Sequence, residues 1–333
     1  MTGSTPPRSG QPDPAPQRRS PDETATLVKR LLQLVQGMRS AGTRSEGARR
    51  ALLGVALLAF LAMGFIALRN YPDDVPQEPN WIGLVLVGIL GPTLTIFANA
   101  EEYRLQGRMV DLRVHRSNAL QTTIVGTAAN LLPIPGSMVV RTQAIAARAG
   151  YRAAIRTTTI AGAAWLFCTV ALAGVAMFFV DLPLVAAILL VVAAAGLGAT
   201  AWLMRRNVAT WRRLFAELLV VETLTAVIGA GRLLGILLTL GLEVSVGQAV
   251  ALTLSGVIAS ATGIFPAGLG VREAVAAGIA STVALPASIG FVATAADRIA
   301  GLVILAVASG IVLVVKPRPV EPDTPGAAHE PHT

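Results

Sequence analysis

Residues 182–204 read LPLVAAILLVVAAAGLGATAWLM and include no charged side chain. About 20 apolar residues in a row are enough for an α-helix to cross the hydrocarbon core of a bilayer. The other fold that can cross a bilayer, a closed β-barrel, needs shorter segments in which apolar and polar residues alternate, and this run does not alternate. The stretch therefore predicts an all-α integral membrane protein.

The composition of the whole chain agrees with a membrane protein and argues against a nucleic-acid binder. Of the 333 residues, 53% are hydrophobic and 14% are charged, whereas soluble domains average about 25% charged residues. The formal net charge of +8 comes from basic residues between apolar runs, where the positive-inside rule and anionic lipid favour them. We expect membrane lipid, and no nucleic acid, to be the partner.

The apolar runs divide the chain into a transmembrane domain, residues 51–316, and polar ends. Residues 1–19 and 317–333 are predicted to be disordered cytoplasmic tails. Residues 20–50 predict an amphipathic helix that lies on the membrane surface or on the protein's own cytoplasmic loops. Full crossings of the membrane are predicted for residues 51–68, 81–98, 159–180, 182–204, 214–240 and 291–315.

Two further apolar stretches, residues 118–140 and 246–284, are each interrupted by proline and glycine. Lipid cannot satisfy the backbone groups that such breaks release, so the breaks persist only inside protein or beside a water-filled cavity. The residues that break the backbone are Pro133, Pro135 and Gly136 in the first stretch and Pro266, Gly268 and Gly270 in the second.

The distribution of charge predicts how the chain is oriented. Residues 1–50 carry nine Lys or Arg and four acids, whereas residues 70–80 carry three acids and no base. The N-terminus is therefore expected in the cytoplasm and the loop 70–80 outside. Arginines flank residues 118–140 on both sides, so this stretch is predicted to enter from the cytoplasm, turn at its break and return. By the same rule residues 246–284 form a hairpin that enters from outside, and the C-terminus is cytoplasmic.

The predicted architecture is thus six full crossings and two opposed re-entrant hairpins, arranged as an inverted repeat in the cytoplasmic (inner) membrane. Transporters of this kind bind substrate near the bilayer midplane, where broken helices meet. An arginine follows each break: Arg141 follows the first, and Arg272, next to Glu273, follows the second. The start of a half-helix and a bidentate guanidinium both favour an anion, and phosphate is the natural ligand. Arg141 has a second interpretation, in which it extends to the cytoplasmic interface.

Charged residues also occur inside the predicted spans, among them Glu222, Arg232, Asp297 and Arg298. A charge at this depth costs at least about 2.5–3.5 kcal/mol on insertion scales, so it normally pairs with another charge or lines a pathway. The sequence leaves both interpretations open. We include Glu222 and Arg298 among the candidate substrate-binding residues.

Motifs for catalysis or metal binding do not occur in the sequence. The single cysteine, Cys168, lies in an apolar run, and two of the three histidines, His329 and His332, lie near the C-terminus. Neither metal-ligand spacing, a nucleophile elbow nor a phosphate-binding P-loop is found. We therefore expect no catalytic residue, no metal and no cofactor.

The two breaks resemble signatures of the lysylphosphatidylglycerol synthase transmembrane family, also described as flippase-like. Its late signature, Pro-Gly-Gly-x-Gly-x-x-Glu, is similar to residues 266–273, with Ala267 in place of a glycine, and an arginine of its following span is matched by Arg298. The family's early signature of Asn, Pro, Gly-acid and Arg resembles Asn130, Pro133, Gly136 and Arg141, with Ser137 in the place of the acid. The resemblance covers roughly residues 51–315 and adds Asn130 to the candidate site.

The resemblance implies a membrane lipid translocase that moves an anionic-headgroup lipid, such as a modified phospholipid or a polyprenyl phosphate-linked lipid, between leaflets. Arg141, Arg272 and Arg298 would then hold the phosphate. Only 18 residues follow Val315, so we expect no aminoacyltransferase domain like that of the best-known members. Two alternatives are a secondary transporter of a small anionic solute and a non-transporting partner of a cell-envelope glycosyltransferase or other lipid-modifying enzyme. The sequence predicts no oligomeric state.

Overall fold

The computed structural model describes residues 79–130, 136–262 and 270–314, together with residues 58, 61, 62, 64–66 and 69. All regular secondary structure among these residues is α-helical. The predicted tails, the amphipathic helix and most of the span 51–68 lie outside the described residues. The same holds for the break residues Pro133, Pro135, Pro266 and Gly268, whereas Gly136 and Gly270 are described.

Five helices in the described part of the chain are long and apolar enough to cross a membrane. They correspond to five of the six predicted crossings, and the protein is therefore a polytopic helical membrane protein. The first of them, Trp81–Arg108, continues past the predicted end at residue 98. The charged sequence that follows stabilises this extension, since Glu101 pairs with Arg104 one turn later on the same helix. The five helices are α3 (Trp81–Arg108), α6 (Tyr151–Phe178), α7 (Pro183–Asn207), α8 (Trp211–Thr239) and α11 (Ala287–Val314).

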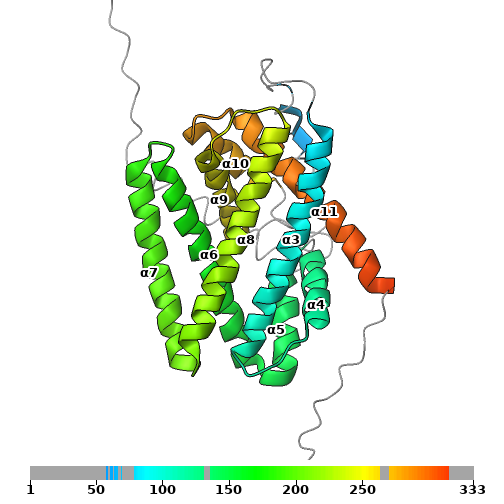
Figure 1. Ribbon diagram of the computed structural model, residues 1–333, viewed down its shortest axis with the longest axis vertical. Helices are drawn as coiled ribbons and strands as arrows, with labels where there is room; N and C mark the ends of the chain where they lie inside the picture. The colour runs from blue at the N-terminus through cyan, green and yellow to red at the C-terminus, as the bar shows by residue number, and fades with distance from the viewer. Residues whose placement is uncertain are drawn as a thin grey trace, which may run out of the picture.

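Each broken stretch forms two short helices that pack on each other. Their lengths of 14, 14, 17 and 12 residues correspond to at most about 26 Å of helix, which is less than the roughly 30 Å of a hydrocarbon core. Figure 1 shows the first pair in the lower half of the bundle and the second pair in the upper half. The pairs are α4 (Arg116–Ala129) with α5 (Gly136–Ala149), and α9 (Val246–Thr262) with α10 (Val271–Thr282).

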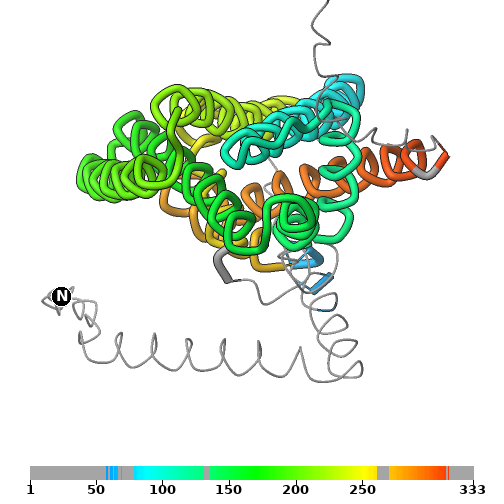
Figure 2. The backbone as a smooth tube through the Cα atoms, turned by 90° about the horizontal axis from the view of Figure 1, so that it is seen from below, coloured from blue at the N-terminus to red at the C-terminus, as the bar shows by residue number. Residues whose placement is uncertain are grey.

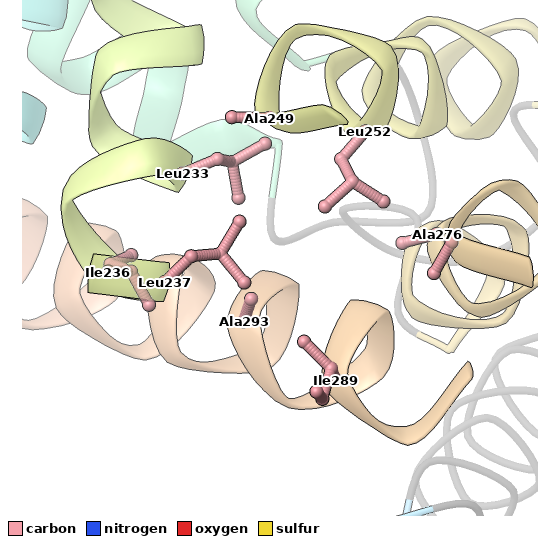
Figure 3. Packing of buried hydrophobic residues seen from close by; sticks show 9 residues of the cluster. Leu233, Ile236, Leu237, Ala249, Leu252, Ala276, Ile289 and Ala293 are labelled. Carbon is pink, nitrogen blue, oxygen red and sulfur yellow. The ribbon is translucent and has the colours of Figure 1, made fainter. Parts of the chain in front are cut away.

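The second pair packs against three long helices. α9 packs against α6 and α8, and α10 packs against α11. α6 and α7 form a hairpin at one edge of the bundle, and α11 lies at the opposite edge (Figures 1 and 2). The interior of this region is apolar. Figure 3 shows its buried side chains, which include Leu233 and Leu237 of α8, Leu252 of α9, Ala276 of α10, and Ile289 and Ala293 of α11.

Two glycines allow the short helices to approach their neighbours closely. A Cβ atom on Gly290 of α11 would lie 2.6 Å from the carbonyl oxygen of Ala276 in α10. A Cβ atom on Gly136, at the start of α5, would lie 2.2 Å from the carbonyl group of Ala129 in α4. In lipid the hydrophobic effect does not drive helices together. Small residues at helix contacts stabilise the bundle instead, because they allow the backbones to pack closely.

The two ends of the bundle differ in charge. At the lower end of Figure 1, where α3 leads to α4, α5 to α6 and α7 to α8, the helix ends are rich in arginine. The turns between α6 and α7 and between α8 and α9, at the other end, carry Asp181 and Glu243 and no basic residue. The arginines at the lower end are Arg104, Arg108, Arg113, Arg116, Arg148, Arg152, Arg156, Arg205, Arg206, Arg212 and Arg213.

Gly290→Ala is expected to destabilise the protein, because its Cβ atom meets backbone that cannot rotate away. Overpacking of this kind costs about 1–3 kcal/mol, more than the gain of up to about 1 kcal/mol in helix propensity. The matched control is Gly310→Ala on the same helix, where a Cβ atom meets nothing within 4 Å. Thermal unfolding in detergent should give a lower Tm for the first variant alone; equal Tm values would contradict the close α10–α11 contact.

Candidate functional site

Polar side chains, most of them charged and all of them buried or partly buried, gather around the two short helices that follow the breaks. The "α5 cluster" consists of Glu102, Gln106, Arg141 and Glu222, from α3, α5 and α8. The "α10 cluster" consists of Arg232, Arg272, Glu273, Asp297 and Arg298, from α8, α10 and α11. Among the described residues, no group of three His, Cys, Asp or Glu is arranged to hold a metal ion.

In the α5 cluster, Arg141 joins α5 to α3. Its Nη1 donates to Glu102 Oε2 at 2.7 Å, and its Nη2 donates to the backbone carbonyl of Asn99 at 3.1 Å. Gln106, one turn further along α3, donates to the other oxygen of Glu102 at 2.8 Å. Arg141 is 8% exposed, so it reaches into the bundle, which disfavours the interpretation that it extends to the interface.

Glu222 of α8 completes the α5 cluster. It is 1% exposed, and its Oε1 has no hydrogen-bond partner. It lies within electrostatic range of both Glu102 and Arg141. One guanidinium therefore faces two carboxyl groups in this part of the bundle.

Asn130 has a structural contact at the first break. It ends α4 as the C-cap residue, and its side-chain Oδ1 accepts a hydrogen bond from the backbone N–H of Ser137 at 2.7 Å. This bond satisfies one of the N–H groups that the first turn of a helix leaves unpaired. Asn130, expected from the family resemblance to belong to the substrate site, thus ties the end of α4 to the start of α5.

Glu273 organises the start of α10. Gly270 precedes the helix with φ of 78°, a conformation that glycine adopts without the strain that a side chain imposes. Its N–H donates to Glu273 Oε2 at 2.9 Å, as in a capping box. Arg298 of α11 donates from Nε to the other oxygen, Oε1, at 2.6 Å. Both oxygens of this fully buried carboxylate are therefore used.

Asp297 lies between two arginines. Arg272 Nη2 donates to its Oδ2 at 2.8 Å, and Arg232 Nη2 lies 2.6 Å from its Oδ1. The second contact is an ion pair without a hydrogen bond, because no donor is oriented toward Asp297 Oδ1. Asp297 is 3% exposed. Two partly buried cations thus share one buried carboxylate.

Arg232 fits between α8 and α3 because Gly91 leaves room for it. A Cβ atom on Gly91 would lie 2.2 Å from Arg232 Cγ, near the base of the side chain. The Nη1 of Arg232 donates to the hydroxyl of Thr95, one turn further along α3, at 3.1 Å. This glycine and this threonine therefore position the guanidinium beside Asp297.

The structure pairs each predicted anion-binding arginine with a carboxylate and distributes the arginines over two clusters. Arg141 belongs to the α5 cluster, and Arg272 and Arg298 belong to the α10 cluster. Sequence reasoning missed Glu102 because it lies beyond the predicted end of its span. It noticed Arg232 and Asp297 only as charges at depth, since one sequence does not reveal which helices are neighbours.

Asp297→Asn is expected to be destabilising, by about 3 kcal/mol, the lower end of the range for breaking a buried ion pair, because it leaves two partly buried guanidinium groups without their shared carboxylate. The double variant Asp297→Asn/Arg272→Gln should recover part of this loss, since one unpaired cation is removed. Asp181→Asn, in an exposed turn, is the control. Thermal unfolding in detergent compares these variants, together with Arg272→Gln alone, with the wild type; strictly additive effects of the two single changes would show that Asp297 and Arg272 are not coupled.

No protein-family model and no curated protein sequence matches this chain. The resemblance to the flippase-like family therefore rests on the residues at the two breaks.

Proposed function

We propose that this protein is a membrane lipid translocase, which moves a lipid with an anionic headgroup between the two leaflets. The lipid would be a modified phospholipid or a polyprenyl phosphate-linked lipid. The observation that carries the proposal is the surplus of positive charge in the α10 cluster, where Arg232 and Arg272 share the carboxylate of Asp297. Arg298 and Glu273 pair with each other and do not change this balance. A phosphate group would supply the missing negative charge and accept bidentate hydrogen bonds from a guanidinium.

Arg272 is the residue of this cluster best suited to receive the phosphate. Its Nε has no hydrogen-bond partner, and a buried charged donor without a partner is unfavourable. Its side chain is 25% exposed, against 15% for that of Arg232. It also lies in the first turn of α10, where the helix dipole adds partial positive charge.

The position of the α10 cluster favours a lipid over a small solute. α11 supplies Asp297 and Arg298 and lies at the edge of the bundle (Figures 1 and 2). The residues that follow them on α11, among them Ile299, Leu302 and Val303, have exposed apolar side chains. The charged and the apolar faces of α11 are separated by no more than the helix diameter of about 10 Å. A lipid headgroup can therefore reach the cluster while the lipid chains stay in the bilayer.

The two pairs of short helices support a transporter architecture. We propose that α4–α5 and α9–α10 are opposed re-entrant hairpins of an inverted repeat. None of these four helices is long enough to cross the membrane, and the two pairs occupy opposite ends of the bundle (Figure 1). The positive-inside rule assigns the arginine-rich end to the cytoplasm, which is consistent with the inner membrane and with cytoplasmic termini. The resemblance of residues 266–273 to the flippase-like signature agrees with this proposal.

Reconstitution into liposomes tests the proposal. Headgroup-labelled fluorescent phosphatidylglycerol should exchange between leaflets faster in the presence of the protein than in protein-free vesicles, as measured by quenching of the outer leaflet. Arg272→Gln should slow exchange about tenfold or more, because hydrogen bonds to charged groups contribute about 1.5–3 kcal/mol. Arg206→Gln, at the arginine-rich end and stacked on Trp202, is the matched control and should keep the wild-type rate.

The same vesicles distinguish the alternatives. Labelled phosphatidylcholine, which has no net charge, should exchange more slowly than phosphatidylglycerol. Uptake of labelled inorganic phosphate without lipid exchange would favour a transporter of small anions. Co-purification with a glycosyltransferase without any flux would favour the non-transporting partner, and full exchange in Arg272→Gln would reject the α10 cluster as the headgroup site.

A further inference from the structure

The α5 cluster has the opposite charge balance to the α10 cluster. Its single guanidinium, Arg141, uses both Nη atoms on Glu102 and on the carbonyl of Asn99. Glu222 is nevertheless almost completely buried beside this pair, and its Oε1 has no partner. A second ionised carboxylate without a cation of its own is very unfavourable in such a place, because burial removes the water that would stabilise it.

We propose that Glu222 is a proton-binding site, and that its proton determines whether Arg141 pairs with Glu102 or with Glu222. The arrangement in the structure, with Arg141 on Glu102, is the protonated one. The proton neutralises Glu222, so that the cluster holds one carboxylate for one guanidinium. When the proton leaves Glu222 for water, the cluster gains a negative charge that competes for Arg141.

Among the charged residues around Glu222, Arg141 is the cation that can pair with its ionised carboxylate. α6 contributes Cys168, which lies within electrostatic range of Glu222, and α9 has no charged residue between Val246 and Thr262. The charged residues of the other elements packed on α8 are engaged elsewhere or lie at helix ends. On α8 itself Glu217 accepts from Arg108 and Arg213, and on α3 Arg104 pairs with Glu101. On α6 Arg152 lies in the first turn and Arg156 donates to Asn207, while on α7 Arg205 and Arg206 lie in the last turn. On α11 Asp297 pairs with Arg232 and Arg272, and Arg298 pairs with Glu273.

The cluster has the unused groups that an exchange of partners requires. Arg141 Nε is a buried donor without an acceptor, and Glu222 Oε1 is a buried acceptor without a donor. Glu102 would keep one hydrogen bond when Arg141 moves, because Gln106 donates to its Oε1 at 2.8 Å. A donor and an acceptor are therefore both available for the second pairing.

The exchange would change which helix α5 is tied to. Arg141 lies in the second turn of α5, and its present contacts bind α5 to α3. Pairing with Glu222 would bind α5 to α8 instead. Because α5 begins directly after the first break, a proton would select between two positions of the α4–α5 pair, which is the kind of two-state element that couples one ligand to another. This coupling to lipid movement rests on the proposed function; the proton site itself does not.

Infrared spectroscopy of the purified protein in nanodiscs tests the proton site without any transport assay. The wild type should show a band of a protonated carboxyl group near neutral pH that shifts in D₂O and disappears at alkaline pH. Glu222→Gln should lack this band, and Glu217→Gln, an arginine-paired glutamate on the same helix, should retain it. Glu222→Asp keeps the carboxyl group and should change the frequency of the band. This variant replaces Glu222→Gln in the test if the glutamine variant does not fold. A band that is absent, or unchanged in Glu222→Gln and Glu222→Asp, overturns the inference.

Lipid exchange in liposomes tests the coupling. The wild-type rate should depend on pH, by up to about tenfold per pH unit, the limit for one proton, and Glu222→Gln should exchange lipid at a rate independent of pH. The same pH dependence in wild type and Glu222→Gln overturns the coupling. A lipid-exchange rate that falls when choline replaces sodium in the buffer also overturns it, because the coupled ion would then be sodium. No exchange in the wild type rejects the proposed function, while the infrared band still decides the proton site.

Discussion

The interior of a bilayer offers no water to polar groups, and the buried charges of this protein have therefore to find partners within the protein. Arg141 ties α5 to α3, Arg298 ties α11 to α10, and Asp297 joins α8, α10 and α11. These contacts connect the helices that follow the breaks to the long helices around them. Apolar packing fills the space between, as around Leu252 (Figure 3), but in lipid it discriminates weakly between neighbours. The ion pairs add directional contacts that specify which helices meet.

Length and apolar character were sufficient to predict the long helices, since a crossing of the bilayer sets the length of the element. Proline and glycine likewise predicted where the two remaining stretches divide into short helices. The pairing of the charges could not be predicted, because it depends on which helix faces which. Glu102 illustrates this, since it is polar, close to the expected membrane boundary and 39 positions away from Arg141. Asn130 is a second case: a contact to Ser137 across a break is visible only once both helices are in place.

The two clusters carry opposite imbalances, and this difference gives each of them its chemical character. The α10 cluster has three guanidinium groups for two carboxylates, since Arg232 and Arg272 share Asp297 while Arg298 pairs with Glu273, and it is suited to an anion. The α5 cluster has two carboxyl groups for one guanidinium and is suited to a proton. They are centred on the two helices that follow the breaks, α5 and α10, which lie in opposite halves of the bundle (Figure 1). An anionic headgroup and a proton are thus the two species whose binding would bring each cluster to charge balance.

Gly91 shows how a small residue can depend on a charge in another helix. Arg232 Cγ packs so close to Gly91 that only a hydrogen atom fits there as a side chain. Any larger residue at position 91 would displace the arginine from Asp297. Positions 91 and 232 should therefore evolve together. Glycine would accompany arginine, and a shorter or uncharged residue at position 232 would release position 91 to vary. Aligned homologous sequences would record this dependence as covariation between two positions that lie 141 residues apart in the chain, counted as 232 minus 91.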